Sequence, residues 1–259
     1  MIRRIDRQEY LACYNKGLTD TEIAEKLGFA HTSVSKFRRK ILKLPLVQDN
    51  IELTSFQKEV LTGTLLGDST VRYVHSQCRH PNLTFSHTER HFEYFLKKYE
   101  IFNSLLSTYV KRKNIKHGYK SSRSYYQATG RNLKCLKSYR DIFYPSGTKI
   151  IPVSFLEKEF SECSLAYLFM DDGNSAGRTI NLSLHCFELP NLKDFVELLF
   201  KKFNLEFTIK ADKTFYLRQR SAETFYNLVK NNITECMKYK LAGIESYLTI
   251  KNGIAKNTN

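Results

Sequence analysis

Two short apolar segments, each ending in aspartate, constrain the fold of this chain most strongly. The first is LTGTLLGDS over Leu61–Ser69, and the second is LAYLFMDDG over Leu165–Gly173. Their apolar residues recur at helical spacing, which predicts a helix in each segment. Aligned with each other, the segments place Asp68 and Asp172 at the same position, 104 residues apart. That period is too long for a solenoid repeat and indicates a duplicated half-domain.

The aspartate at the end of each predicted helix opposes a local rule. The C-terminus of a helix is the negative end of its dipole, so a carboxylate there is unfavourable. Residues that contradict local preferences are candidates for function. Two carboxylates brought close together also repel each other, and a divalent cation such as Mg²⁺, which prefers hard oxygen ligands, removes that conflict.

The segments that follow each helix alternate between strand and helix character in a similar order. Thr54 and Gln57 form a capping box before the first helix. After it, strands are predicted over 70–74, 82–87, 108–113 and 125–129, with helices over 88–106 and 133–143. After the second helix, strands are predicted over 179–184, 207–211 and 214–218, with helices over 190–203 and 222–231.

The first fifty residues predict a separate three-helix unit of the helix-turn-helix type. Thr19 and Glu22 form a capping box, and Gly28 ends the second helix. The third helix is expected to turn an apolar face inward (Val34, Phe37, Ile41 and Leu42). Its outer face offers candidate DNA contacts (Thr32, Ser33, Ser35, Lys36 and Arg39). The alternative is a generic helical unit whose charged face is merely solvated.

The net charge of +15, from 41 Lys and Arg against 26 Asp and Glu, indicates a polyanionic partner. The excess is concentrated in residues 106–149, which hold eleven basic residues and one acid, Asp141. Phosphates and base edges are expected to contact a basic hairpin there (Lys111, Arg112, Lys113, Lys116, Lys120, Arg123 and Gln127). The second half offers fewer candidates (Lys210, Lys213, Arg218 and Arg220).

Other features favour an intracellular protein. No apolar run reaches the ~18 residues that span a bilayer, and the first residues contain no apolar signal-peptide core. The six cysteines contain no CxxC pair, which is typical of a reduced compartment. A composition rich in Lys, Asn, Ile and Tyr suggests an A+T-rich genome, such as that of an organelle or a phage.

Taken together, these motifs resemble the LAGLIDADG homing endonucleases, and specifically their two-motif branch related to group I intron maturases. Sequences of that branch also carry segments like Lys149–Pro152 (KIIP) and Met237–Leu241 (MKYKL). The resemblance covers about residues 54–250. Ser69 replaces the usual final glycine of the first motif, and Tyr167 and Asp171 replace small residues in the second.

The resemblance implies an α+β fold of tandem repeats related by a pseudo-twofold axis. Two antiparallel sheets would form a saddle for DNA with helices behind it, and the two motif helices would pack together at the axis. The expected organisation is a helix-turn-helix domain (1–47), a linker (48–53), repeat 1 (54–158), repeat 2 (159–250) and a polar tail (251–259). With both repeats in one chain, a monomer is expected.

The resemblance also implies a metal-dependent cut in both strands of a long DNA site. Asp68 and Asp172 would be the catalytic acids and would hold Mg²⁺ or Mn²⁺. Gly67 and Asp171 would belong to the metal surroundings, with Asp171 contributing a backbone carbonyl or a secondary contact. Lys149 and Lys240 would approach the active site, where they could neutralise phosphate charge or orient water.

Two other functions fit the same motifs. One is a maturase that helps a group I intron RNA fold, and the other is a non-catalytic DNA-binding regulator. A histidine- and cysteine-rich stretch (His75, Cys78, His80, His87 and His91) lacks zinc-finger spacing and is interpreted as ordinary polar sequence. Glu89 is expected to lie near the water network of the active site.

Overall fold

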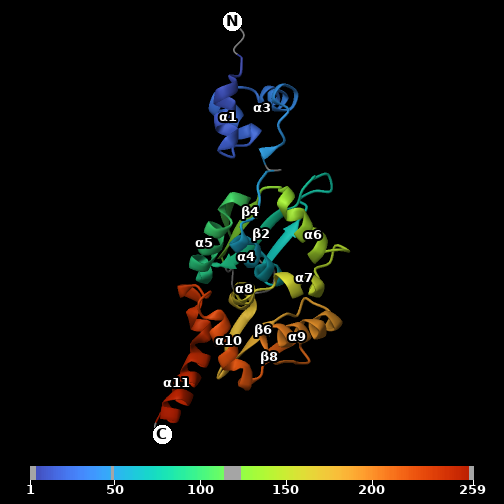
Figure 1. The fold of residues 1–259 in the computed structure, drawn as a ribbon. Helices are drawn as coiled ribbons and strands as arrows, with labels where there is room; N and C mark the ends of the chain where they lie inside the picture. Colours follow the sequence, from blue (N-terminus) through green and yellow to red (C-terminus); the bar gives the residue numbers. More distant parts are fainter. Residues whose placement is uncertain (1–3, 48–49, 114–123, 257–259) are drawn as a thin grey trace.

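The computed structural model describes residues 4–47, 50–113 and 124–256. Its parts are stacked along one direction: a small helical unit at the N-terminal end, then two α+β units, with the C-terminal helix projecting from the second (Figure 1). The expected α+β fold with two antiparallel sheets is confirmed. None of the helices among these residues is long and apolar enough to cross a membrane.

The N-terminal unit contains three helices around a hydrophobic core of its own. They are α1 (Arg7–Asn15), α2 (Asp20–Leu27) and α3 (His31–Lys36), and α3 continues as a π-helix over Phe37–Leu42. The capping box of Thr19 and Glu22 is formed, and Gly28 ends α2 in the left-handed conformation. Tyr10, Ile23 and Val34 are fully buried where the helices meet.

The prediction for one residue of the inner face, Ile41, is wrong. Ile41 is 66% exposed, whereas Arg38 is buried. The Arg38 side chain binds Asp20 at 3.0 Å and donates to the carbonyl of Leu44 at 2.8 Å. The π-helix has a wider turn than the α-helix that the spacing assumed, so the inward positions shift along the chain.

Repeat 1 forms a sheet with strand order β1-β2-β4-β3, all antiparallel. Its strands are β1 (Ser69–Arg72), β2 (Asn82–Thr88), β3 (Leu106–Lys113) and β4 (Ser124–Gly130). Its helices are α4 (Ser55–Leu66), α5 (Phe92–Ile101), α6 (Lys137–Phe143) and α7 (Val153–Glu159). The predicted helix over 88–106 is shorter than expected, because β2 extends to Thr88 and short 3₁₀ turns flank α5.

Repeat 2 has the same topology, with strand order β5-β6-β8-β7. Its strands are β5 (Gly173–Ala176), β6 (Thr179–Ser183), β7 (Phe207–Ile209) and β8 (Thr214–Leu217). Its helices are α8 (Glu162–Asp172), α9 (Leu189–Phe203), α10 (Ala222–Val229) and α11 (Ala242–Lys256). The last helix continues past position 250, where the sequence places the start of a polar tail.

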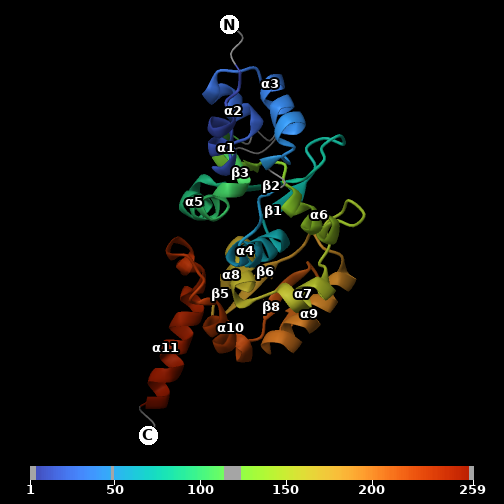
Figure 2. The same cartoon turned by 45° about the horizontal axis from the view of Figure 1, so that its top comes forward.

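The two motif helices, α4 and α8, pack directly against each other between the two sheets (Figure 2). Gly63 makes this approach possible, because a Cβ atom at this position would lie 2.1 Å from the carbonyl oxygen of Ser164. Across the same contact, the hydroxyl of Ser164 donates to the carbonyl of Glu59 at 2.8 Å. The helix pair therefore fixes how the two repeats sit relative to each other.

Candidate active site

The two aligned aspartates lie where the central helices give way to the sheets. Asp68 stands in the turn between α4 and β1, and its side chain is 42% exposed. Asp172 is the last residue of α8, and β5 begins at the next residue. Because α4 and α8 pack side by side, the two carboxylates come close enough for the charge of Asp68 to act on Asp172.

Each of these two acids is partly buried and lies near the negative charge of another carboxylate. Burial, followed by the charge of Asp171, raises the pKa of Asp68 to about 6. Burial, followed by the charges of Asp68 and Asp171, raises the pKa of Asp172 to about 7. Lys149 and Lys240 oppose part of both pKa shifts. A divalent cation would relieve the remaining repulsion, so the donor set fits such an ion.

Lys149 and Lys240 each donate hydrogen bonds to backbone carbonyls of their own repeat beside these acids. Lys149 Nζ donates to the carbonyls of Gly67 and Ser69, at 2.8 and 3.2 Å. Lys240 Nζ donates to the carbonyl of Met170 at 2.6 Å. Burial lowers the pKa of both lysines, and the neighbouring aspartates counteract that pKa shift. The structure thus brings all four expected catalytic residues into one neighbourhood.

The side chain of Asp171 lies beside Asp68 and enters the interior of repeat 1. It forms a fully buried ion pair with Lys98 of α5, at 3.1 Å. Tyr94 and Thr64 donate further hydrogen bonds to its carboxylate, at 2.8 and 2.5 Å. Burial alone would raise the pKa of Asp171, but Lys98, His87 and these hydrogen bonds hold it below its usual value.

His87 also lies beside the acids. Its Nδ1 is 3.5 Å from a carboxylate oxygen of Asp68, and its side chain is buried. Burial, followed by the charge of Lys98, lowers the pKa of His87 to about 3, so the ring is neutral at neutral pH. No role was predicted for Lys98 from the sequence. A usable signal existed, because Lys98 shares helical spacing with Tyr94, Phe95 and Phe102 on an otherwise apolar face.

Potential metal ligands can be compared from this geometry. Ligand atoms of Asp68, His87 and Asp171 lie within 4.8 Å of one another. The oxygens of Asp171 already accept hydrogen bonds from four groups, including the charged Lys98. Any cation bound by this carboxylate would have to displace that ammonium. The carboxylates of Asp68 and Asp172 are therefore better placed than that of Asp171 to bind a cation.

The strand register shows which side chains of sheet 1 face the open side. Arg112 pairs with Tyr125, and Val110 pairs with Gln127, so these residues share one face. A hollow of about 180 Å³ opens on that face next to Asp68. It is lined by side chains from β1, β2 and β4, including Thr70, Arg72, Thr84, Ser86 and Gln127.

Lys111 and Lys113 lie on the other face of sheet 1, which carries α5. Lys111 pairs with Tyr126, whose ring packs 4.1 Å from that of Phe92 in α5. Lys111 also forms an ion pair with Glu89. Glu89 is thus engaged on the helix side of the sheet rather than in the surroundings of the acids. Three further expected DNA contacts (Lys116, Lys120 and Arg123) lie outside the described residues.

The expected contacts of repeat 2 and of the N-terminal unit are placed individually. Lys210 lies over the ring of Tyr216 at 4.7 Å, and Lys213 donates to the carbonyl of Phe187. Arg218 is exposed, whereas Arg220 is paired with Glu206. Four of the candidates on the third N-terminal helix are exposed (Thr32, Ser33, Lys36 and Arg39), and Ser35 is half-buried.

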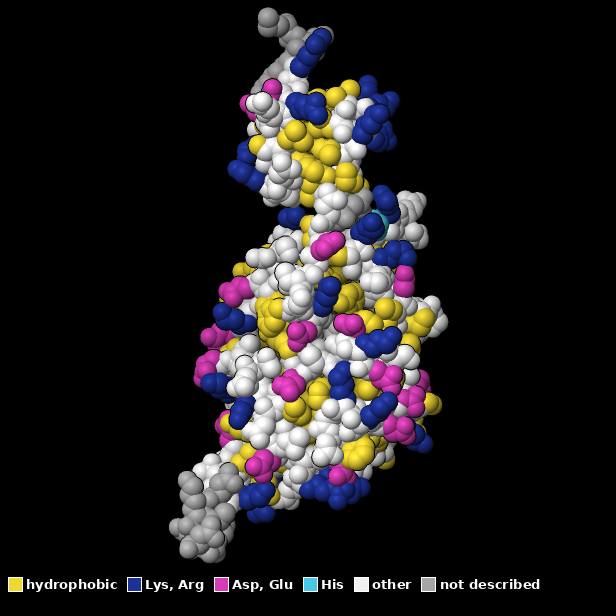
Figure 3. All heavy atoms as spheres, in the orientation of Figure 1, with side chains coloured by type: hydrophobic (Ala, Val, Ile, Leu, Met, Phe, Trp, Pro, Cys, Tyr) yellow, Lys and Arg dark blue, Asp and Glu magenta, His cyan; other side chains and the backbone are white. Residues whose placement is uncertain are grey.

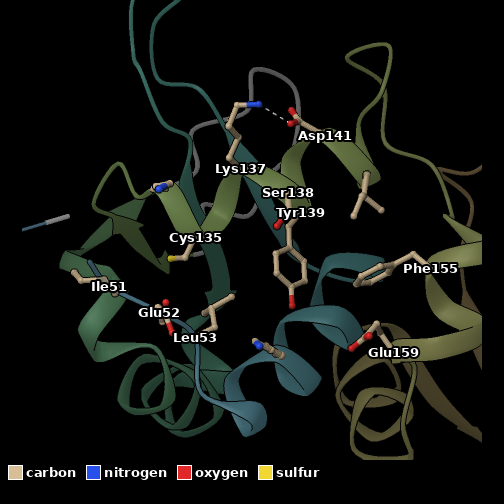
Figure 4. A pocket seen from close by; sticks show the side chains of 13 residues that line it. Ile51, Glu52, Leu53, Cys135, Lys137, Ser138, Tyr139, Asp141, Phe155 and Glu159 are labelled. Carbon is tan, nitrogen blue, oxygen red and sulfur yellow. Dashed lines mark hydrogen bonds and ion pairs between the residues drawn. The ribbon is translucent and has the colours of Figure 1, made fainter. Parts of the chain in front are cut away.

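Two other features lie outside this site. Apart from His87, the histidine- and cysteine-rich stretch joins no group of three potential metal ligands within the part of the chain that the structure describes. A hollow of about 770 Å³ lies between the linker residues and helices α4, α6 and α7 (Figure 4). Its lining includes Leu53, Tyr139 and Phe155 but neither Asp68 nor Asp172.

A family model described as the LAGLIDADG DNA endonuclease family matches residues 58–225, which include both motifs. The chain belongs to this family. It is 30% identical over 200 residues to a probable intron-encoded endonuclease 1 of Wickerhamomyces canadensis, covering 73% of this chain and 85% of that protein. The resemblance inferred from the two motifs is therefore confirmed.

Further similarities agree with the family. The chain is 28% identical over 104 residues to a cytochrome b mRNA maturase bI2 of Debaryomyces hansenii, covering 38% of this chain and 39% of that protein. The fold is similar to the solved homing endonuclease I-WcaI bound to its DNA recognition sequence. That match has a TM-score of 0.67 and 26% identity, and covers 74% of this chain and 88% of the other.

Proposed function

We propose that this LAGLIDADG family member is a site-specific endonuclease that uses Mg²⁺ or Mn²⁺ to hydrolyse both strands of a long DNA target. The observation that carries the proposal is the pair Asp68 and Asp172, held together at the ends of two packed helices with raised pKa values. A protein that only binds DNA gains nothing from paired carboxylates that would face phosphates.

In this proposal Asp68 and Asp172 hold the divalent cation, and Gly67 and Asp171 belong to its surroundings. When bound there, a divalent cation would lower the pKa of a coordinated water and offset charge on the leaving oxygen. Lys149 and Lys240 keep the two motif backbones in place and offset negative charge near the scissile phosphates. One acid in each repeat allows each half to act on one strand.

DNA would lie across the open faces of the two sheets. Arg112, Arg72 and Gln127 face that side in repeat 1, and Lys210 offers a cation in repeat 2. Lys111 and Lys113 would reach phosphates only from the rim of the sheet, because they lie on its helix side. The exposed face of the third N-terminal helix would make additional DNA contacts outside the two sheets.

The test is a plasmid library of candidate targets incubated with the purified chain and Mg²⁺. Wild-type protein is expected to convert supercoiled plasmid to linear product. Asp68→Asn and Asp172→Asn should each reduce linear product at least about a hundredfold. Asp141→Asn removes an exposed acid that pairs with Lys137, and serves as the control. Absence of cleavage by wild type, or equal cleavage by all variants, would defeat the proposal.

The similarity to a cytochrome b mRNA maturase favours one second function, assistance to the folding of a group I intron RNA. The same basic surface would bind RNA in place of DNA. Splicing assistance that survives Asp68→Asn combined with Asp172→Asn would support this function. Loss of splicing assistance in that variant while its RNA binding persists would count against a separate maturase role.

A further inference from the structure

A buried ion pair joins the two repeats directly behind the acids, and the proposed function gives it no role. The side chains of Asp171 and Lys98 are both 0% exposed, and Lys98 Nζ contacts both carboxylate oxygens at 3.1 Å. Burying two charges is costly unless hydrogen bonds complete the arrangement. Tyr94 and Thr64 supply those bonds, so the network is complete.

The network breaks the pseudo-twofold symmetry at its axis. Asp171 occupies the same motif position in repeat 2 that Gly67 occupies in repeat 1. A Cβ atom at Gly67 would lie 2.6 Å from the Cβ of Asp171. The two equivalent positions therefore face each other, and only one of them can carry a side chain. That side chain comes from repeat 2 and is received by repeat 1.

The network also holds the first acid in place. The backbone N–H of Asp68 donates to a carboxylate oxygen of Asp171, at 3.2 Å. The preceding carbonyl, of Gly67, accepts from Lys149 at 2.8 Å. Both contacts act on the peptide group that joins Gly67 to Asp68, one at its N–H and the other at its carbonyl. His87 fills the remaining side, 3.5 Å from the Asp68 carboxylate and 3.8 Å from that of Asp171.

We propose that Asp171 and Lys98 form a positioning pair that fixes the Asp68 backbone relative to Asp172. Asp171 acts through Asp68, and its own carboxylate does not contact the metal ion or the scissile phosphate. Its effect on cleavage rests on the proposed endonuclease function, whereas its effect on the backbone does not. Loss of the pair displaces Asp68 while Asp172 keeps its own helix, so one strand is cut more slowly than the other.

Two double variants separate positioning from simple stability. Asp171→Ala with Lys98→Met removes the pair together with the acceptor for the Asp68 N–H. Asp171→Asn with Lys98→Gln removes the charges but keeps an acceptor and a donor of similar shape. Lys97→Met, at an exposed neighbour that pairs with Glu100, is the matched control. Thr64→Val, which removes one donor to Asp171, provides a milder variant should the first double variant not fold.

The first measurement is amide hydrogen exchange of the metal-free full chain, which requires no cleavage activity. The Ala/Met variant should exchange about tenfold faster in the segment 64–72, and Thr64→Val about threefold faster. The Asn/Gln variant and Lys97→Met should stay near wild type. Unchanged exchange in that segment, equal acceleration throughout the protein, or equal acceleration in both double variants would overturn the inference.

The second measurement follows nicked and linear plasmid over time, well below each unfolding temperature. The Ala/Met variant should accumulate nicked circle, with the second cut slowed at least about tenfold relative to the first. The Asn/Gln variant should recover most of the linear product. Nicked and linear products in the wild-type ratio for the Ala/Met variant would contradict positioning. Failure of wild type to cut would refute the proposed function and leave the exchange result to decide.

Discussion

The two repeats share one topology yet differ at their common axis. Each contributes a motif helix, an aspartate at its end and a lysine that binds the motif backbone. At the axis, repeat 1 receives the Asp171 carboxylate from its neighbour and holds the buried Lys98 to match it. The space at Gly67 admits a single side chain, so close packing itself forces the asymmetry. The duplicated fold thus keeps two aspartates and two lysines at equivalent places while the contacts around them diverge.

The sheets differ as well. In repeat 1, β3 and β4 have eight and seven residues, whereas the corresponding strands β7 and β8 of repeat 2 have three and four. The larger basic excess also lies in repeat 1. Blue side chains gather at the upper right edge of the body in Figure 3, where Figure 1 draws α6 of repeat 1. Repeat 1 therefore offers the longer surface for a polyanion, and repeat 2 the shorter one.

The largest predicted effect concerns the contact that holds the repeats together. Gly63→Ala should lower the free energy of unfolding by about 3 kcal/mol, because the new methyl group would collide with the Ser164 carbonyl. Gly253→Ala in the projecting helix α11 meets nothing within 4 Å and should be neutral or slightly stabilising. Urea unfolding measures both. Equal transition midpoints for the two variants would show that the helix contact is looser than described.

The next prediction compares the two lysines. Lys149→Met and Lys240→Met should each slow cleavage by about ten- to a hundredfold, because each removes a positive charge beside the acids and a bond to a motif backbone. Lys137→Met, which removes an exposed cation paired with Asp141, is the control. Single-turnover cleavage with saturating protein gives the rates. Unequal losses would show that the two halves contribute differently to catalysis.

The features that the sequence predicted correctly depend on local patterns. Capping boxes at Thr19 and Thr54 and the aligned aspartates depend on residues close together in the chain, and the structure contains them. The ion pair of Lys98 and Asp171 joins residues 73 positions apart, so no spacing rule links them. Lys98 alone carried a local signal, a charge on an apolar helix face.

Side-chain direction was the second feature beyond the reach of sequence. The pairing of β3 with β4 contains a register shift between Leu106 and Thr108. Since alternation along a strand reverses with each one-residue slip, the charge run alone could not tell Arg112 from Lys111. The same reason applies to Ile41, where a π-helical turn changed the phase.

A smaller effect concerns pH and compares the two acids. The raised pKa of Asp172 means that the folded state keeps a proton that the unfolded chain releases near pH 4. Stability therefore falls as pH rises from about 4 to about 7. Asp172→Asn removes this loss and should add about 2 kcal/mol of unfolding free energy at pH 8 in EDTA, and little at pH 4.

Asp68 provides the comparison for that prediction. Its pKa is raised less, to about 6, and its carboxylate is more exposed to water. Asp68→Asn should therefore stabilise the protein less, over a window that ends near pH 6. Thermal unfolding of both variants across pH 4–8 gives the difference. A stability gain that does not change with pH would point to packing rather than to charge.

The smallest predicted effect tests the strand register of repeat 1. Arg112 faces the open side of the sheet with Tyr125, and Lys111 lies on the helix side, paired with Glu89. Arg112→Gln should weaken DNA binding by about three- to tenfold and reduce the slope of log affinity against log salt by about one. Lys111→Gln should change both quantities less, since its charge is already matched by Glu89. If Lys111→Gln has the larger effect, the helix side rather than the open face of the sheet carries the phosphate contact.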